Sequence, residues 1–173
     1  MLLSSTVTEK IVQAAPPAIQ PLANNPACSI YNKSPQAKES ITWTGACKNG
    51  LTHGKGTGQW VYYRLGERKI DTYVGEMEAG KRHGRGKILW SGGSSYDGDW
   101  KNGVRHGNGL YTWPGANKYK GEFKNNKRHG QGIMVFNGGS KYKGTWAKSK
   151  KHGQGIFVYR NGNQLHGEFR NDK

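Results

Sequence analysis

Histidine is the residue of this sequence whose type and spacing most directly suggest chemistry, because it is a common zinc ligand. Five of the six histidines occupy the same place in a regular pattern; they are His53, His83, His106, His129 and His152. On neighbouring β-hairpins, successive histidines would lie two strands apart, or about 9.5 Å. Zinc needs its ligand nitrogens about 2 Å from the ion. We therefore expect no metal site and no cofactor.

Asp97 and Asp99 form the pair of carboxylates that comes closest to an acid–base site. On one strand they would lie about 7 Å apart, which overlaps the carboxylate separation of inverting glycosidases. However, Glu76, Glu122 and Glu168 occupy the place that corresponds to Asp99 in other parts of the pattern. This recurrence indicates a solvated row of carboxylates that offsets the charge of nearby lysines. We expect no catalytic residues and no enzymatic activity.

An internal repeat sets the positions of all these residues. Four units of 23 residues each open with a tyrosine; these are Tyr73, Tyr96, Tyr119 and Tyr142. If the opening residue is offset 0, then offset 2 is Gly, offset 4 is Met, Trp or Phe, and offsets 10, 11 and 13 are His, Gly and Gly. A less regular unit begins at Trp43, with a seven-residue insertion before the next unit, and a truncated unit begins at Leu165. A fixed period of this length indicates an array in which each unit packs on its neighbours.

Each unit has the pattern of a β-hairpin. In residues 96–100, apolar or small residues alternate with charged ones, as in a half-buried strand. Turn signals follow at Asn49-Gly50, Ala79-Gly80 and Asn102-Gly103, and a second strand then runs to an aromatic residue at offset 17. Offsets 0, 4 and 17 hold 14 of the 19 aromatic residues, so we expect most rings to stack along one face, where they form a core or line a groove. The predicted fold of residues 41–173 is an all-β, elongated single-sheet meander of consecutive β-hairpins.

Residues 1–40 differ from the repeats in composition. They hold five of the six prolines and show no sustained apolar period, so we expect a flexible, proline-containing N-terminal tail. No apolar run within them has the length of a signal peptide core, and no segment is long enough to span a membrane. The protein is then either cytoplasmic, or exported to a compartment such as the periplasm by a signal peptide lying upstream.

Two cysteines, Cys28 and Cys47, leave two interpretations open. A disulfide between them would attach the tail to the first unit, closing a loop of about 20 residues that is worth roughly 3 kcal/mol and implying an oxidising compartment. Alternatively, Cys47 is a small buried core residue at offset 4, and Cys28 is a thiol with no partner.

The formal net charge of +16 is concentrated on the repeats. Cations directly precede the histidines of four units; they are Lys81, Arg82, Arg105, Lys127, Arg128, Lys150 and Lys151. Because their offsets are constant, we expect them to align along one long edge of the array and to bind anionic phospholipid or another acidic surface. The alternative is a solvated edge whose charge prevents aggregation between sheets.

The signature in residues 96–109, Tyr-x-Gly-x-Trp followed by Gly103 and by His106-Gly107-x-Gly109, resembles the MORN repeat family. The resemblance covers residues 43–173, with five units and a partial one. It implies an elongated, twisted single-sheet rod and roles in phospholipid binding, membrane tethering, scaffolding or self-association. The first unit, with Trp43, Cys47 and the preceding Cys28, also resembles bacterial exported members of the family.

These observations favour a non-enzymatic binding or tethering protein whose basic edge faces an anionic membrane, with peripheral membrane association. The alternative is a scaffold that binds protein partners or forms homo-oligomers through the terminal strand near Leu165 and Phe169. A nucleic-acid or acidic-polymer binder is the less favoured candidate, since it would need aromatic rings interleaved with cations on an exposed face. Within the repeats only four rings fall outside the expected stack; they are Tyr62, Tyr63, Tyr111 and Phe157.

Overall fold

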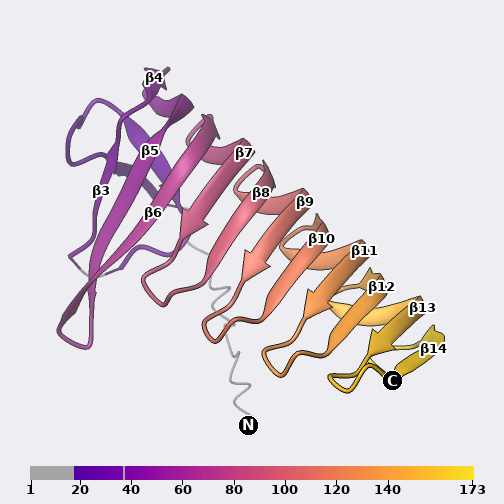
Figure 1. The fold of residues 1–173 in the computed structure, drawn as a ribbon. Helices are drawn as coiled ribbons and strands as arrows, with labels where there is room; N and C mark the ends of the chain where they lie inside the picture. Colours follow the sequence, from indigo (N-terminus) through magenta and orange to yellow (C-terminus); the bar gives the residue numbers. More distant parts are fainter. Residues whose placement is uncertain (1–17, 37) are drawn as a thin grey trace, which may run out of the picture.

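A computed structural model describes residues 18–36 and 38–173 of the chain. These residues form fourteen strands and no helix, arranged as one elongated sheet (Figure 1). In chain order the strands are β1 (Ala18–Pro21), β2 (Ser29–Asn32), β3 (Ser40–Trp43), β4 (Ala46–Lys48), β5 (Leu51–Arg64), β6 (Glu67–Glu78), β7 (Lys81–Leu89), β8 (Ser95–Lys101), β9 (Val104–Thr112), β10 (Lys118–Lys124), β11 (Lys127–Val135), β12 (Lys141–Ala147), β13 (Lys150–Val158) and β14 (Gln164–Phe169).

The sheet is a meander over most of its length. From β5 to β14 each strand pairs with the next one along the chain, and every one of these pairs is antiparallel. Figure 1 shows these strands following one another along a rod whose far end is β14. The predicted all-β, single-sheet meander of hairpins is confirmed. One parallel contact, between Ser29 of β2 and Leu51 of β5, makes the sheet mixed at its N-terminal end.

The turns inside the units share one backbone conformation. Asn102 and Gly103 both have positive φ, at 51° and 83°, and consecutive left-handed residues match the twist of two-residue hairpins. Lys148 and Ser149 adopt the same conformation, at 51° and 72°, without a glycine. The seven-residue insertion of the first unit lengthens the hairpin of β5 and β6, which are paired out to Arg64 and Glu67.

The core is a stack of rings on one face of the sheet. The opening tyrosines of the four regular units are fully buried, at 0% exposed. The ring of Tyr96 meets Trp100 of its own unit and Phe123 of the next unit edge-on, with centroids 5.1 Å apart in both pairs. The expected rows at offsets 0 and 4 are therefore present. At offset 17 the row is only partly buried, and its last member, Tyr159, is 46% exposed.

A further row of apolar side chains, at offset 15, joins the stack, which the sequence pattern did not predict. Tyr111 and Phe157, expected outside the stack, pack against the core together with Ile88 and Met134. The register explains this, because Tyr111 lies directly opposite Tyr96 on the neighbouring strand, and paired residues project to the same face.

Glycines at offsets 2 and 13 make the stack possible. A Cβ atom at Gly109 would lie 2.4 Å from ring atom Cε2 of Tyr96, and one at Gly98 would lie 2.6 Å from the hydroxyl oxygen of the same tyrosine. Any side chain at these positions would displace the ring, so the glycines allow the tyrosine to lie flat over the backbone.

Part of the expected tail is structured. β1 and β2 form an antiparallel pair, and Leu22, Cys28 and Ile30 are buried. The prediction of a flexible tail is wrong for residues 18–36 and 38–40, whereas residues 1–17 and 37 lie outside the described residues. The few apolar residues here belong to the same core cluster as the first units of the array, and they occur once rather than in a repeated pattern. We call residues 18–36 the N-terminal cap.

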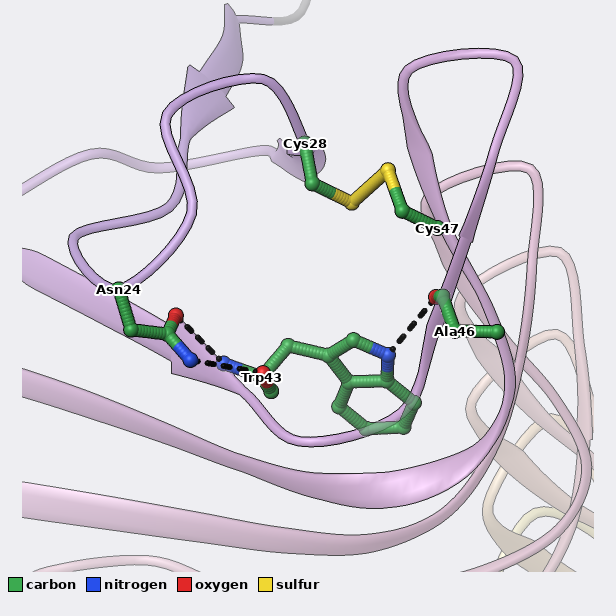
Figure 2. The surroundings of a disulfide bond; sticks show 5 residues. All are labelled: Asn24, Cys28, Trp43, Ala46 and Cys47. Atoms are coloured by element: carbon green, nitrogen blue, oxygen red, sulfur yellow. Dashed lines mark hydrogen bonds between the residues drawn. A yellow bond between two sulfur atoms is a disulfide. The ribbon is translucent and has the colours of Figure 1, made fainter.

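A disulfide joins Cys28 of the cap to Cys47 of β4, with Cα atoms 5.8 Å apart (Figure 2). The nearby Asn24 side chain binds both main-chain groups of Trp43: its Nδ2 donates to the carbonyl at 2.9 Å, and its Oδ1 accepts from the N–H at 3.2 Å. The indole N–H of Trp43 donates to the carbonyl of Ala46 at 3.2 Å. Cys47 itself is exposed rather than in the core. The cap thus covers Trp43, the opening residue of the first unit.

Candidate functional site

The seven cations predicted to bind anions occupy two different surroundings. Those at offset 8 lie at the turns, and those at offset 9 lie on the aromatic face. The offset-8 residues are Lys81, Lys127 and Lys150, and the offset-9 residues are Arg82, Arg105, Arg128 and Lys151. Offset 9 pairs with offset 4 across the hairpin, as Arg105 does with Trp100, so its side chain projects over the ring stack.

Each offset-9 cation lies above rings of more than one unit. The guanidinium carbon of Arg105 is 4.9 Å from the ring centre of Tyr111, 5.6 Å from that of Phe123 and 5.7 Å from that of Tyr96. That of Arg128 is 4.2 Å from the ring of Trp146. Cation–π contacts of this kind contribute about 0.5–2 kcal/mol each. These cations therefore hold neighbouring units together.

Two of the arginines also bind the turn of the following unit. Nη2 of Arg105 donates to the carbonyl of Asn126 at 3.0 Å, and Nη2 of Arg128 donates to the carbonyl of Ser149 at 2.6 Å. Burial lowers the pKa of each of these guanidinium groups. The expectation that offset-9 cations extend along an outer edge is thus wrong, because the hairpin register directs them inward.

Exposed lysines gather at three consecutive turns of the array. Of the predicted offset-8 cations, Lys127 and Lys150 are exposed, and three more lysines at these turns and the preceding one are exposed as well. Lys81 instead places its Nζ 4.3 Å from the ring centre of Tyr31 in the cap. We call the exposed set the basic turn edge; it consists of Lys101, Lys124, Lys127, Lys148 and Lys150. Among the described residues, none of these lysines has a carboxylate within ion-pair distance.

The opposite edge of the sheet is less basic over the regular units. Its turns, residues 91–94, 114–117, 137–140 and 160–163, are composed of Gly, Ser, Asn, Ala and Pro together with Arg160. The exposed Lys118 and Lys141 begin the strands that follow two of these turns, and the tip of the β5–β6 hairpin adds Arg64, Arg68 and Glu67. In a meander, alternate turns lie at opposite edges. The rod is therefore electrostatically asymmetric over its regular units, with five exposed lysines at one edge and fewer cations at the other.

The carboxylates considered for catalysis have structural partners. Oδ2 of Asp99 accepts the main-chain N–H of Asn108 at 2.8 Å, and its Oδ1 accepts from Arg85 at 3.2 Å. Glu122 accepts the N–H of Gln131 in the same way, also at 2.8 Å. Asp99 and Glu122 therefore fix the irregular start of the second strand, a role that the sequence did not suggest. Glu76 of the same row lies 4.0 Å from Nζ of Lys55, as expected of carboxylates that offset lysine charge. Within residues 18–36 and 38–173, no three His, Cys, Asp or Glu side chains form a group that could hold a metal ion.

A comparison with known families decides the classification. The family model described as MORN repeat matches residues 45–61, 73–95, 96–117, 119–141 and 142–164, which together exceed half of the chain. The chain belongs to the MORN repeat family. The second, third, fourth and fifth matched regions begin at the tyrosines that open the regular units. Among curated proteins, none matches the chain.

MORN repeats are generally involved in binding to membranes or to proteins. No helix formed by the described residues is long and apolar enough to cross a membrane. Two features distinguish the surface of the MORN array. One is the basic turn edge, and the other is β14, the last strand of the sheet order, whose residue Leu165 is 49% exposed.

Proposed function

We propose that this MORN protein is a non-enzymatic, peripheral binding module whose basic turn edge binds anionic phospholipid at a membrane surface. The observation that carries the proposal is the charge asymmetry of the rod. Five exposed lysines from three consecutive turns, Lys101 to Lys150, lie along one edge without carboxylate partners among the described residues. Along the same units, the opposite edge holds three cations, Lys118, Lys141 and Arg160.

The spacing of the turns suits a flat surface. Successive hairpins advance by two strands, or about 9.5 Å, so lysines of three turns can reach one leaflet together. Each cation near an anionic leaflet contributes about 1 kcal/mol, and three to five of them therefore give about 3–5 kcal/mol. Binding of this strength is reversible, corresponds to a dissociation constant on the order of a millimolar, and weakens with salt.

Co-sedimentation with liposomes tests this proposal. The protein is mixed with vesicles of phosphatidylcholine alone or with added phosphatidylserine, at low and at near-physiological salt. We expect binding only to the anionic vesicles, and less of it at the higher salt. Absence of binding to phosphatidylserine vesicles at low salt would overturn the proposal.

Self-association through β14 is the second candidate, because this strand is the last in the sheet order of the described residues. A free strand edge can pair with another chain, and the exposed Leu165 lies opposite Phe157 at this end of the ring stack. Sedimentation-velocity measurements would then show a dimer that the Leu165→Lys variant abolishes. A wild-type protein that stays monomeric at high concentration would exclude it.

The non-enzymatic role and the compartment are parts of the same proposal. Asp99, the best candidate for an acid–base residue, already binds the Asn108 N–H and Arg85, which leaves it a structural role. A disulfide such as Cys28–Cys47 persists in oxidising compartments. This favours an exported, periplasmic protein over a cytoplasmic one.

A further inference from the structure

A cavity lies between the N-terminal cap and the aromatic face of the first units. Its volume is about 520 Å³, within the range of about 300–1,000 Å³ that is usual for small-molecule sites. The array contributes Trp60, Trp90 and Arg82 to its wall, while the cap and the segment that follows it contribute Asn32 and Glu39. None of the lysines of the basic turn edge lines this cavity. It is therefore separate from the surface proposed to bind membranes.

Arg82 differs from the arginines at the same offset in later units. Arg105 and Arg128 donate to the carbonyls of the following turn. The guanidinium of Arg82 has no hydrogen-bond or ion-pair partner in the part of the chain that the structure describes, although it lies 4.8 Å from the ring centre of Trp100 and 5.5 Å from that of Trp60. Its donors are thus available to a ligand. Arg82 also lines a second hollow, together with Asn32 and Trp60.

The wall provided by the N-terminal cap is fixed. The disulfide of Cys28 holds one end of it, and the N–H of Tyr31 donates to the carbonyl of Gly80 at 2.9 Å. Asn32 donates to Gln20 at 2.8 Å and to Glu39 at 2.6 Å. The cavity is consequently pre-formed, which reduces the entropic cost of binding.

The polar groups of the cavity include both acceptors and donors. Oδ1 of Asp71 accepts from Tyr62 at 3.2 Å and from the N–H of Ser91 at 2.8 Å. Oε2 of Glu39 accepts from Asn32 and from the N–H of Gln36 at 3.0 Å. Each carboxylate keeps its second oxygen without a hydrogen-bond partner among the described residues, while Arg82 and the exposed Arg64 supply donors.

We propose that this cavity is a binding site for a saccharide. Hydroxyl groups both donate and accept hydrogen bonds, so a hydroxyl-rich ring matches a site that presents carboxylate oxygens beside guanidinium donors. The indoles of Trp60 and Trp90 supply amphipathic surfaces on which the C–H faces of a sugar ring can pack. A simple anion would use the arginines but would face Asp71 and Glu39. An apolar ligand would leave the donors of Arg82 and the second oxygen of each carboxylate without partners.

The experiment is a titration of the full chain with glucose, N-acetylglucosamine and glucuronic acid, followed by the indole N–H signals in ¹H–¹⁵N spectra. We expect at least one sugar to shift the signals of Trp60 and Trp90 saturably, with a dissociation constant of roughly a millimolar. The signal of Trp146, which lies in the buried stack of a distant unit, should not move. Absence of saturable shifts with all three sugars up to about 100-fold that concentration would overturn the proposal. Sodium acetate is the anion control, and shifts as large as those of the sugars would also overturn it.

Matched variants locate the site. Arg82→Gln should weaken sugar binding about tenfold or more, as expected for loss of charged hydrogen bonds, and Trp90→Leu should weaken it as well. Trp113→Leu changes the residue at the same offset one unit further along, outside the cavity, and should leave the affinity unchanged. Equal losses in the two tryptophan variants would contradict the assignment. Arg82→Gln should not alter liposome binding, so this test is independent of the proposed membrane function.

Discussion

The hydroxyl of Tyr96 donates a hydrogen bond to the main-chain carbonyl of Asp99 at 2.9 Å. Asp99 lies at a register shift and has no residue opposite it on β9. The tyrosine hydroxyl therefore supplies a hydrogen-bond donor to the Asp99 carbonyl at a point where β9 offers no paired residue. Tyr73, Tyr119 and Tyr142 repeat the bond to the residue three positions on, at 2.8, 3.0 and 3.2 Å. This bond explains why offset 0 of the regular units is tyrosine rather than phenylalanine.

Removing this hydroxyl tests its contribution. Tyr96→Phe should lower the free energy of unfolding by about 1–2 kcal/mol, because a partly buried carbonyl loses its partner while the ring packing is kept. Urea denaturation followed by far-ultraviolet circular dichroism measures the change. Tyr63→Phe is the control, since Tyr63 is 47% exposed, and its stability should equal that of the wild type. If the Tyr96→Phe variant were as stable as the wild type, the hydrogen bond would contribute nothing to the free energy of unfolding.

Alkaline pH should destabilise the array. Burial raises the pKa of the Tyr73 hydroxyl to about 12, above the value of about 10 in an unfolded chain. The stabilisation is therefore complete below about pH 10 and is lost as the pH rises to about 12, because the unfolded state releases its proton first. Burial also raises the pKa of the Tyr96, Tyr119 and Tyr142 hydroxyls. Urea midpoints should fall across this window, and less steeply for Tyr73→Phe; a constant midpoint would contradict the prediction.

The turn at Ser149 offers a stabilising substitution. Ser149 has a φ of 72°, and its Oγ accepts the N–H of Arg128 at 3.1 Å. Asn126 occupies the same offset with a φ of 68°, and its Oδ1 accepts the N–H of Arg105 at 2.9 Å. Asparagine tolerates left-handed backbone better than serine, so Ser149→Asn should raise the free energy of unfolding by about 0.5–1 kcal/mol.

The reciprocal change serves as the control for this substitution. Asn126→Ser should lower the free energy of unfolding by a similar amount, since the hydrogen bond is kept and only the backbone preference changes. Thermal denaturation of both variants measures the pair. Changes of the same sign in the two variants would mean that backbone preference does not determine stability at this turn.

Loss of the disulfide should loosen the N-terminal cap. Replacing Cys28 and Cys47 together by serine opens a loop of about 20 residues and should cost about 3 kcal/mol in the chain-entropy model. Hydrogen exchange should show the effect locally, because the N–H of Tyr31, which donates to Gly80, would lose protection while the Tyr96 N–H in a central hairpin would keep it. Reductant should have no further effect on the double variant. Unchanged protection at Tyr31 would show that the cap is held without the disulfide.

The repeat period made the fold predictable from the sequence. A strict recurrence of Tyr96, Gly98 and Trp100 identifies the hairpin, its buried face and the stacking of units at once, because each interaction is repeated by the array. The N-terminal cap was not predictable in this way. Leu22, Cys28 and Ile30 contact the end of the array, and such non-repeated contacts leave no period in the sequence.

The face of the sheet to which each cationic side chain at offsets 8 and 9 points was the other feature that the sequence did not reveal. Lys127 and Arg128 are neighbours along the chain, and both precede a histidine, yet one is exposed at the turn and the other lies over the ring of Trp146. Adjacent residues of a strand point to opposite faces, but assigning the faces requires the register shift near offset 3. The recurring glycine at offset 11 is the sequence signal that could have located this irregularity. In the structure this glycine has a positive φ, 55° at Gly130, as in a β-bulge.

The most direct test of the central claim compares two triple variants in binding to phosphatidylserine liposomes at low salt. Lys124, Lys127 and Lys150 of the basic turn edge are changed to Gln in one, and the exposed Lys87, Lys120 and Lys143, which lie outside the turns, in the other. Both variants lose the same charge. At about 1 kcal/mol per cation, the turn variant should bind about 100-fold more weakly, with a much smaller change in the other. Equal losses in the two variants would show that net charge alone drives binding and would contradict a membrane-binding edge.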